Sequence, residues 1–267
     1  MNMIYATFIE SCLNDGAKIA SELFNKVSGV AKPEDNNQVF TEADLMVGSS
    51  IIERIQKAYP EHSIIDEEAG VIIKDPKYIW VIDPIDGTSN YANGSPQYGI
   101  MLGLLIDGQP YAGGIVLPYF AEFFTAEKEA GAFCNGKKLL VNQETELKKC
   151  LVAYGIDGHP EDLERSHKEF QTLEKLVLNI RNLRCSNSAF DTALFLKGSY
   201  AASINQSSKV WDNVAQQILC SEAGALYTTF AGAPLDYAQA LTEVNKNYTW
   251  CAANPSLHQQ IQKLILN

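Results

Sequence analysis

The sequence has no C-x-x-C pair, and its four histidines show no metal-ligand spacing. Its six cysteines are spread over 267 residues, whereas a disulfide framework is typical of a smaller secreted chain. We therefore expect buried free thiols in a reducing compartment. A zinc site of cysteine and histidine is not expected, because such sites have short characteristic ligand spacings.

Long apolar runs and basic tracts are also missing. No stretch of about 18 apolar residues occurs, so no membrane-spanning helix is expected. The first residues lack a basic segment, and Glu10 and Asp15 interrupt their apolar pattern, which is unlike a signal peptide. The formal net charge of -11 disfavours a nucleic-acid partner, because phosphate backbones attract positive charge. These absences predict a cytoplasmic globular protein.

The first half of the chain is predicted to mix helices with antiparallel strands. Apolar residues at helical spacing predict a helix over 3–28 and another from Thr41, which opens a variant of the capping box. The polar segment 29–38 between them is expected to be a loop. Strands are expected at 63–65, 78–82, 98–106, 111–117, 122–126 and 131–133, with Asp107-Gly108 as a hairpin signal.

After about residue 150, short buried strands alternate with helices, which is typical of α/β structure. Strands are expected at 151–154, 179–183, 200–204 and 249–252, and helices at 161–178, 188–196, 212–223 and 256–266. No repeat or linker interrupts the chain. We predict an α+β half, 1–148, and an α/β half, 149–267, that share an extensive interface as one compact unit.

The segment from Trp80 to Asn90 carries the clearest chemical signal. An apolar strand over 78–82 delivers Asp83 at its carboxyl end, and Pro84 is expected to enforce a turn there. Asp86 then returns to the same side three residues later. The segment therefore offers two carboxylates to a hard cation.

The next two residues suit an anion. Gly87 lets the backbone approach a ligand closely, and Thr88 can open a helix whose free N–H groups bind phosphate. Asp-Pro or Asp-Gly alone is more often an ordinary turn without a ligand. The full string after an apolar strand favours a metal and phosphate site.

Two further acidic elements extend this site if the fold brings them together. Adjacent glutamates such as Glu67 and Glu68 are usually a solvated face, and an aspartate such as Asp212 in a first helical turn is usually a cap. If Glu67, Asp83, Asp86 and Asp212 converge, each pair of like charges about 4 Å apart costs about 4 kcal/mol at intermediate dielectric. Bound cations or raised pKa values must offset that cost, and an all-oxygen ligand set favours Mg²⁺.

These motifs resemble the inositol monophosphatase family of Mg²⁺-dependent, Li⁺-sensitive phosphatases. The family signature W-x-I-D-P-[IL]-D-G-T-x-N-[FY] is met in full by Trp80 to Tyr91. A second signature, W-D-x-A-A-G-x-x-x-x-x-E-A-G-G, is met in part by 211–215 and 222–224, and weaker matches lie at 39–44, 63–68 and 252–255. The resemblance covers essentially the whole chain. It implies a layered αβαβα sandwich with an antiparallel-rich first sheet and a mixed second sheet.

The resemblance also implies two or three Mg²⁺ ions in each site. Glu67, Asp83 and the Ile85 carbonyl would hold the first ion. Asp83, Asp86 and Asp212 would hold the second, and Glu67 would face a third through water.

The implied catalytic residues are Glu67 and Thr88, which would activate the attacking water, and Asp44, which would support Thr88 by hydrogen bonding. Glu68 would contact the metal ligands rather than the ions themselves. The implied phosphate and substrate contacts are Asp86, Gly87, Thr88, Ala189, Asn205 and Asp212. The reaction would release inorganic phosphate and an alcohol without a phosphoenzyme.

The sequence departs from the family at positions on the alcohol side. Asp66, Asn187 and Gln216 stand where glycine is usual, and Asn205 stands where inositol-selective enzymes carry a glutamate. The metal residues are all kept. The reaction is therefore predicted more firmly than the alcohol.

The resulting hypothesis is a phosphatase of myo-inositol monophosphate or a similar small polyol phosphate. The same chemistry on histidinol phosphate, fructose bisphosphate, NADP or 3′-phosphoadenosine 5′-phosphate is an alternative. Another is a protein-interaction factor, since some bacterial family members bind ribosomal-RNA transcription machinery. The resemblance further implies a homodimer, and no direct nucleic-acid or membrane partner is expected.

Overall fold

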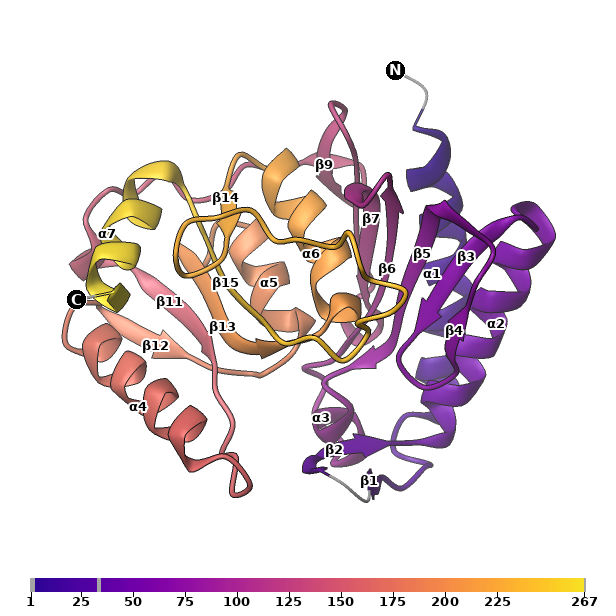
Figure 1. Ribbon diagram of the computed structural model, residues 1–267, viewed down its shortest axis with the longest axis horizontal. Helices are drawn as coiled ribbons and strands as arrows, with labels where there is room; N and C mark the ends of the chain where they lie inside the picture. The colour runs from indigo at the N-terminus through magenta and orange to yellow at the C-terminus, as the bar shows by residue number, and fades with distance from the viewer. Residues whose placement is uncertain (1–2, 33–34, 267) are drawn as a thin grey trace.

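The computed structural model describes residues 3–32 and 35–266, without the side chains of 32–38. Helices and strands alternate along the chain (Figure 1). The α-helices are α1 (Ile4–Leu23), α2 (Glu42–Ala58), α3 (Thr88–Ala92), α4 (Leu163–Val177), α5 (Ala189–Leu196), α6 (Val210–Glu222) and α7 (Pro255–Leu266). Short 3₁₀ turns lie at η1 (Pro118–Phe120) and η2 (Leu147–Lys149). Among the helices described, none has the length and apolar character needed to cross a membrane.

The first large sheet has eight strands in the order β10-β9-β8-β7-β6-β5-β3-β4. They are β3 (His62–Asp66), β4 (Gly70–Ile72), β5 (Asp75–Asp86), β6 (Gly99–Ile106), β7 (Gln109–Leu117), β8 (Glu122–Glu127), β9 (Gly131–Cys134) and β10 (Lys137–Lys138). Only β3 and β5 pair in parallel, and the other pairs are antiparallel. The turn between β6 and β7 is made by Asp107 and Gly108, whose φ values of 51° and 71° are those of a tight hairpin turn.

The second sheet has the order β12-β11-β13-β15-β14. Its strands are β11 (Leu151–Gly155), β12 (Asn182–Arg184), β13 (Ala202–Ser208), β14 (Leu226–Thr228) and β15 (Tyr248–Ala253). β11 pairs in parallel with β12 and β13, while β15 pairs antiparallel with β13 and β14. The sheet is therefore mixed, as the resemblance implied.

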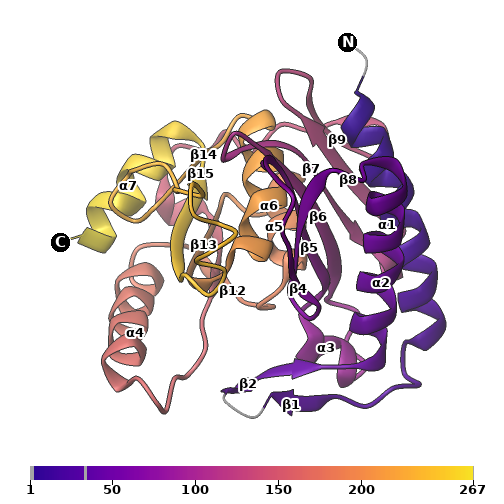
Figure 2. The same ribbon diagram turned by 45° about the vertical axis from the view of Figure 1, so that its right-hand side comes forward.

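The elements stack in five layers. α1 and α2 cover the outer face of the first sheet, and α5 and α6 lie between the two sheets. α4 and α7 lie side by side on the far face of the second sheet (Figure 2). The predicted α/β class and αβαβα layering are confirmed. The boundary between residues 148 and 149 stays a prediction.

Helix α6 lies very close to the first sheet because two strands offer it glycines. A Cβ on Gly103 would lie 2.6 Å from Val214 Cγ1, and one on Gly113 would lie 2.8 Å from Ala215 Cα. Both distances are shorter than real Cβ contacts. An element of the second half is thereby locked onto the first sheet, and it carries Asp212 at its start.

Two sequence predictions for the first half are wrong. The segment 29–38, predicted as a loop, contains β1 (Val30–Lys32) and the first part of β2 (Asp35–Phe40), which form a two-stranded antiparallel pair. It belongs to neither large sheet, so it lacks the apolar alternation that marks a strand packed on a core. In the second half, β14 was also missed, and it is only three residues long.

The second wrong prediction concerns Pro84, which does not end its strand. β5 continues to Asp86, with Asp83 opposite Met101 and Asp86 opposite Gly99. Three steps on β5 thus face two steps on β6, which is a β-bulge. Proline is tolerated at a bulge, because the ladder there does not need its missing N–H.

Candidate metal and phosphate site

The bulge in β5 is what brings two carboxylates to one side. Residues three apart on a regular strand point to opposite faces, but the extra residue after Asp83 turns Asp86 back to the same side. Helix α6 adds Asp212 from its first turn. One carboxylate oxygen from each of the three residues lies within 4.8 Å of the others.

Backbone amides orient two of these carboxylates. Ala189 N–H, at the start of α5, donates to Asp86 Oδ2. Lys209 N–H donates to Asp212 Oδ2, so Asp212 also caps α6. Both side chains are thereby held in place without a metal.

The cluster is electrostatically costly when its carboxylates are ionised. Burial raises the pKa of Asp83 well above its usual range, and the charges of Glu67, Asp86 and Asp212 raise it further. Burial and then Asp212 raise the pKa of Asp86 in the same way. Asp83 is 1% exposed, and its buried Oδ1 has no hydrogen-bond partner among the described residues. This donor set fits a divalent cation, which would satisfy the buried oxygen and offset the repulsion.

Glu67 lies in the same cavity, on the turn after β3. Asp66 holds that turn, since its Oδ1 accepts hydrogen bonds from Glu68 N (2.9 Å) and Ala69 N (2.7 Å). Gly48 on α2 gives the Asp66 carboxylate room, because a Cβ there would lie 2.8 Å from Oδ2. Asp66, a departure from the family, therefore has a structural role beside the predicted ligand.

Thr88 and Asp44 are in contact. The Thr88 hydroxyl lies 2.8 Å from the Ile85 carbonyl oxygen and 3.3 Å from Asp44 Oδ1. Asp44 Oδ2 accepts from Thr41 N (2.7 Å), which completes the predicted capping box of α2. Burial raises the pKa of Asp44 to about 6, although the hydrogen bonds from Thr41 lower it. Asp44 thus joins the cap of α2 to the site.

Gly87 has the backbone conformation and the space that only glycine provides. Its φ is 84°, and a Cβ would lie 2.6 Å from Ser188 Cβ. The helix that follows, α3, has five residues, so its dipole is small. An anion here would be bound by the N–H groups of Gly87 and Thr88 themselves rather than by a long helix.

Asn90 connects the signature segment to the loop 186–188, a role that the sequence did not suggest. Its Nδ2 donates to Gln97 O (2.8 Å) and Ser186 O (2.7 Å). In the same loop, Asn187 has a φ of 55°, a conformation that asparagine adopts more readily than other non-glycine residues. This explains why asparagine replaces the usual glycine.

Gln216 is the other residue whose role the sequence missed. It lies one turn after Asp212, donates from Nε2 to Asp212 O (2.5 Å), and accepts from Thr192 Oγ1 on α5. It links the two helices whose first turns carry the Asp212 carboxylate and the Ala189 amide. Its partner Thr192 is remote in sequence. The sequence therefore gave no sign of this role except that Gln216 stands where glycine is usual.

A cavity of about 940 Å³ contains most of the predicted site. It is lined by Glu67, Asp83, Ile85, Asp86, Gly87, Thr88, Asn205 and Asp212. Asp44 and Ala189 are buried behind this lining, in contact with Thr88 and Asp86. Asn205 lies on β13, where its Oδ1 accepts from Ser207 N (2.7 Å). The fold thus brings together residues that span the sequence from 44 to 212.

Comparisons with known proteins show which family and which solved structures the chain is similar to. The model of the inositol monophosphatase family matches residues 2–266. A fructose-1,6-bisphosphatase/inositol-1-monophosphatase of Aquifex aeolicus is 30% identical over 92% of this chain and 89% of its own. A Nus factor SuhB of Xylella fastidiosa is 34% identical over 72% of this chain and 70% of its own. The solved IMPase of Thermotoga maritima superposes with a TM-score of 0.85 at 25% identity, covering 99% of this chain and 97% of its own.

Proposed function

Because the chain belongs to the inositol monophosphatase family, we propose that it is a Mg²⁺-dependent phosphomonoesterase. Its substrate would be a small polyol phosphate such as myo-inositol monophosphate, hydrolysed to the alcohol and inorganic phosphate. The observation that carries this proposal is the approach of Asp83, Asp86 and Asp212 to within 4.8 Å beside the Gly87–Thr88 backbone.

The cluster would hold two or three Mg²⁺ ions. Glu67, Asp83 and the Ile85 carbonyl would form one site, and Asp83, Asp86 and Asp212 the other, with Glu67 facing a third ion through water. When bound, such ions lower the pKa of a water and neutralise charge on the ester oxygens. The buried, unpartnered Asp83 Oδ1 supports its place as a shared ligand.

The chain's own groups would then position the reactants. The amides of Gly87 and Thr88 would donate to the phosphate oxygens. Glu67 and the Thr88 hydroxyl would hold the attacking water and take its proton, with Asp44 keeping the hydroxyl oriented. Water attacks phosphorus, the ester P–O bond breaks, and the alcohol oxygen takes a proton.

A substrate panel tests this proposal. The purified protein with Mg²⁺ should release phosphate from at least one member of a panel that includes myo-inositol 1-phosphate, histidinol phosphate, fructose 1,6-bisphosphate, NADP and 3′-phosphoadenosine 5′-phosphate. EDTA should stop the release. No release from any member would reject the phosphatase assignment.

A second candidate function is a protein-interaction role, since several relatives are named Nus factor SuhB. Replacing the chromosomal copy by Asp83→Asn separates the two. A strain that keeps normal growth with an inactive protein would favour the interaction role. A strain with the phenotype of a deletion would favour catalysis.

A further inference from the structure

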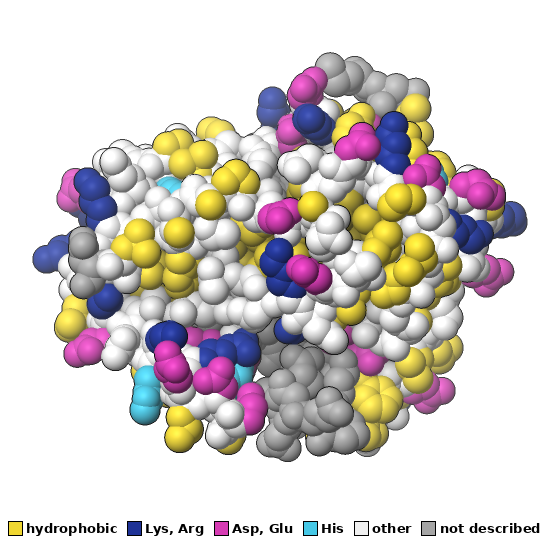
Figure 3. All heavy atoms as spheres, in the orientation of Figure 1, with side chains coloured by type: hydrophobic (Ala, Val, Ile, Leu, Met, Phe, Trp, Pro, Cys, Tyr) yellow, Lys and Arg dark blue, Asp and Glu magenta, His cyan; other side chains and the backbone are white. Residues whose placement is uncertain are grey.

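Asp86 and Asp212 carry like charges that the fold must hold at the distance of one cation site. On the face shown in Figure 3, Asp and Glu side chains are interspersed with Lys and Arg side chains. In the cluster, burial raises the pKa of Asp86 most, and the charge of Asp212 raises it next. The mutual repulsion and the binding of a shared cation both depend on the distance between these carboxylates. Whatever fixes this distance therefore sets how tightly the cation is bound.

The orientation of each carboxylate comes from a different helix. Asp86 Oδ2 accepts a hydrogen bond from the N–H of Ala189, the first residue of α5. Asp212 lies in the first turn of α6 and caps that helix. Both helices lie between the two sheets (Figure 1). A shift of α5 relative to α6 would therefore turn one carboxylate away from the other.

A side-chain bridge joins these two helices about one turn beyond the carboxylates. Thr192 Oγ1 on α5 donates to Gln216 Oε1 on α6, and Gln216 Nε2 donates to Asp212 O (2.5 Å). Thr192 follows Ala189 by three residues and Gln216 follows Asp212 by four, which is close to one helical turn in each case. Among the described residues, the bond between Thr192 and Gln216 is the one hydrogen bond that joins α5 to α6.

The bridge is buried and uses both ends of the glutamine amide. Gln216 is 5% exposed and Thr192 is 2% exposed. Both residues belong to the lining of the cavity that contains the cluster. A buried hydroxyl that loses its acceptor is destabilising, so the bridge is expected to persist. A glycine, which is usual in the family at position 216, could not form it.

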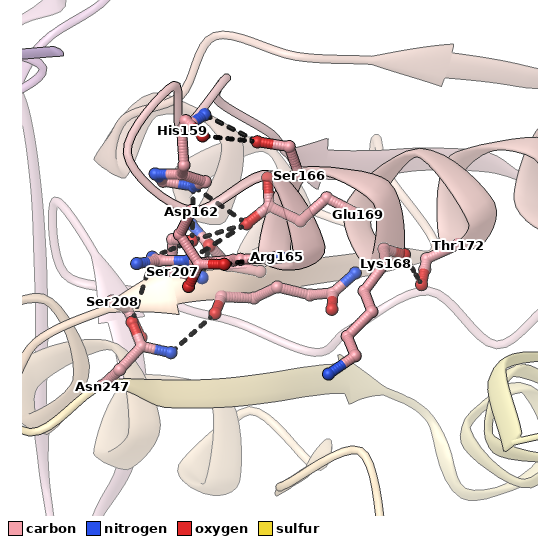
Figure 4. Close-up of polar contacts among 12 residues, drawn as sticks. His159, Asp162, Arg165, Ser166, Lys168, Glu169, Thr172, Ser207, Ser208 and Asn247 are labelled. Carbon is pink, nitrogen blue, oxygen red and sulfur yellow. Dashed lines mark hydrogen bonds and ion pairs between the residues drawn. The ribbon is translucent and has the colours of Figure 1, made fainter.

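The start of α6 is held from the second sheet by a separate set of bonds (Figure 4). Ser207, near the end of β13, accepts from Arg165 Nε (3.0 Å) and donates to Glu169 Oε1 (2.6 Å) on α4. The next residue, Ser208, accepts from Asn213 Nδ2 in α6 (2.9 Å). Helix α6 is thus fixed to its surroundings independently of α5, and the Gln216 bridge ties α5 to it.

We propose that Gln216 is a positioning residue for the metal cluster. Through Thr192 it holds the first turn of α5 against α6, so that Asp86 and Asp212 keep the geometry of one cation site. The inference rests on the proposed function for the identity of the cation, Mg²⁺. It gives the amide a role beyond packing, because the bridge sets the affinity for the cation held by Asp86 and Asp212.

Calorimetric titration with Mg²⁺, and with Mn²⁺ as a second probe, tests the bridge without any substrate. Gln216→Met keeps the length of the side chain but removes both hydrogen bonds. It should weaken cation binding about 10- to 100-fold, the range for residues that orient metal ligands. Thr192→Val should weaken it too. The double variant should lose less than about 2-fold more than Gln216→Met alone, because the two changes remove the same bond.

Phosphate release gives a second readout. In Gln216→Met, the Mg²⁺ concentration that gives half of the maximal kcat should rise by the same factor as the Kd. The KM for the substrate at saturating Mg²⁺ should change less than about 2-fold, because the bridge acts on the cation site.

Gln217→Met is the matched control. Gln217 is the next residue on α6, lies outside the cavity lining, and accepts a hydrogen bond from the Tyr237 hydroxyl (2.7 Å). This variant should lower the Tm about as much as Gln216→Met while leaving the Kd for the cation unchanged. A lower Tm with an unchanged Kd in Gln216→Met would overturn the positioning role and leave Gln216 as a packing residue. An equal Kd change in Gln217→Met would also overturn it.

The two proposals fail in different ways. If the wild type binds Mg²⁺ but releases phosphate from no substrate, the proposed function fails and the calorimetric comparison still decides the role of Gln216. If the wild type releases phosphate and Gln216→Met binds Mg²⁺ as tightly as the wild type does, the positioning role alone fails. If the wild type binds neither Mg²⁺ nor Mn²⁺, both proposals are rejected.

Discussion

At the scale of single residues, the site is a group of carboxylates that the fold holds together against their mutual repulsion. Asp83, Asp86 and Asp212 were each visible in the sequence, because a strand-to-glycine motif and a helix start have recognisable local patterns. Their hydrogen-bond partners were not visible. The bonds of Gln216 to Thr192 and of Asn90 to Ser186 join segments remote in sequence, and such side-chain contacts leave no local signal.

The raised pKa values predict an unusual pH dependence for the metal-free protein. A carboxyl group with a higher pKa in the folded chain binds its proton more tightly there, so stability falls as pH rises between the unfolded and folded values. For Asp44 this interval runs from 3.8 to about 6, a loss of up to about 3 kcal/mol. Asp83 and Asp86 extend the fall to higher pH.

Calorimetric melting from pH 4 to 8 measures this effect. With EDTA the unfolding temperature should fall as pH rises, and Mg²⁺ should reverse the fall most strongly at pH 8, because metal binding displaces protons. A metal-free protein that gains stability from pH 4 to 8 would contradict the clustering of buried carboxylates.

Asp44→Asn separates the support of Thr88 from the capping of α2. Asparagine can still cap α2, but its amide oxygen is a weaker acceptor for the Thr88 hydroxyl than a carboxylate oxygen. We therefore expect kcat to fall about 10- to 100-fold with little change in stability. Thr41→Ala is the control, since it removes the Thr41 hydroxyl from the cap and should cost about 1 kcal/mol with less effect on kcat. Similar kcat values in both variants would argue against a positioning role for Asp44.

At the scale of elements, periodic sequence patterns predicted the helices and strands well. Irregular features of the structure were not predicted. Most helices and core strands lie within a few residues of their predicted ranges. The sequence predicted a turn at Pro84 where the structure has a β-bulge, because proline is common in both features. The start of α1 is capped by Glu127, which accepts from Tyr5 N and Ala6 N (both 3.0 Å) across 121 or more residues. No local pattern reports such a cap.

The contact between α6 and the first sheet predicts a linked loss of stability and activity. Gly113→Ala places a methyl group 2.8 Å from Ala215 Cα, so α6 must move and carry Asp212 with it. We expect a loss of about 1–3 kcal/mol in unfolding free energy. We also expect weaker Mg²⁺ binding, so that a higher Mg²⁺ concentration is needed to reach half of the maximal kcat. Gly158→Ala, where a Cβ would meet no atom of the described residues within 4 Å, should unfold like the wild type. A fully stable and active Gly113→Ala variant would contradict this packing.

At the scale of the whole molecule, two sheets with helices between them create one cavity from both halves of the chain. Its carboxylates come mainly from β5 and α6, and Arg165 of α4 and Lys209 before α6 also belong to its lining. The sequence predicted the layers through family resemblance, but not the place of Arg165 in this lining, because Arg165 lies outside every family motif. The predicted homodimer is testable by light scattering, which should give about twice the mass of 29.4 kDa.

The most direct measurement is phosphate release by wild type and Asp83→Asn across a Mg²⁺ titration, using the best substrate of the panel. The wild type should require Mg²⁺, and Asp83→Asn should lose at least about 100-fold in kcat/KM while keeping its fold by circular dichroism. Full activity of Asp83→Asn, or Mg²⁺-independent release by the wild type, would contradict a metal site built on Asp83, Asp86 and Asp212.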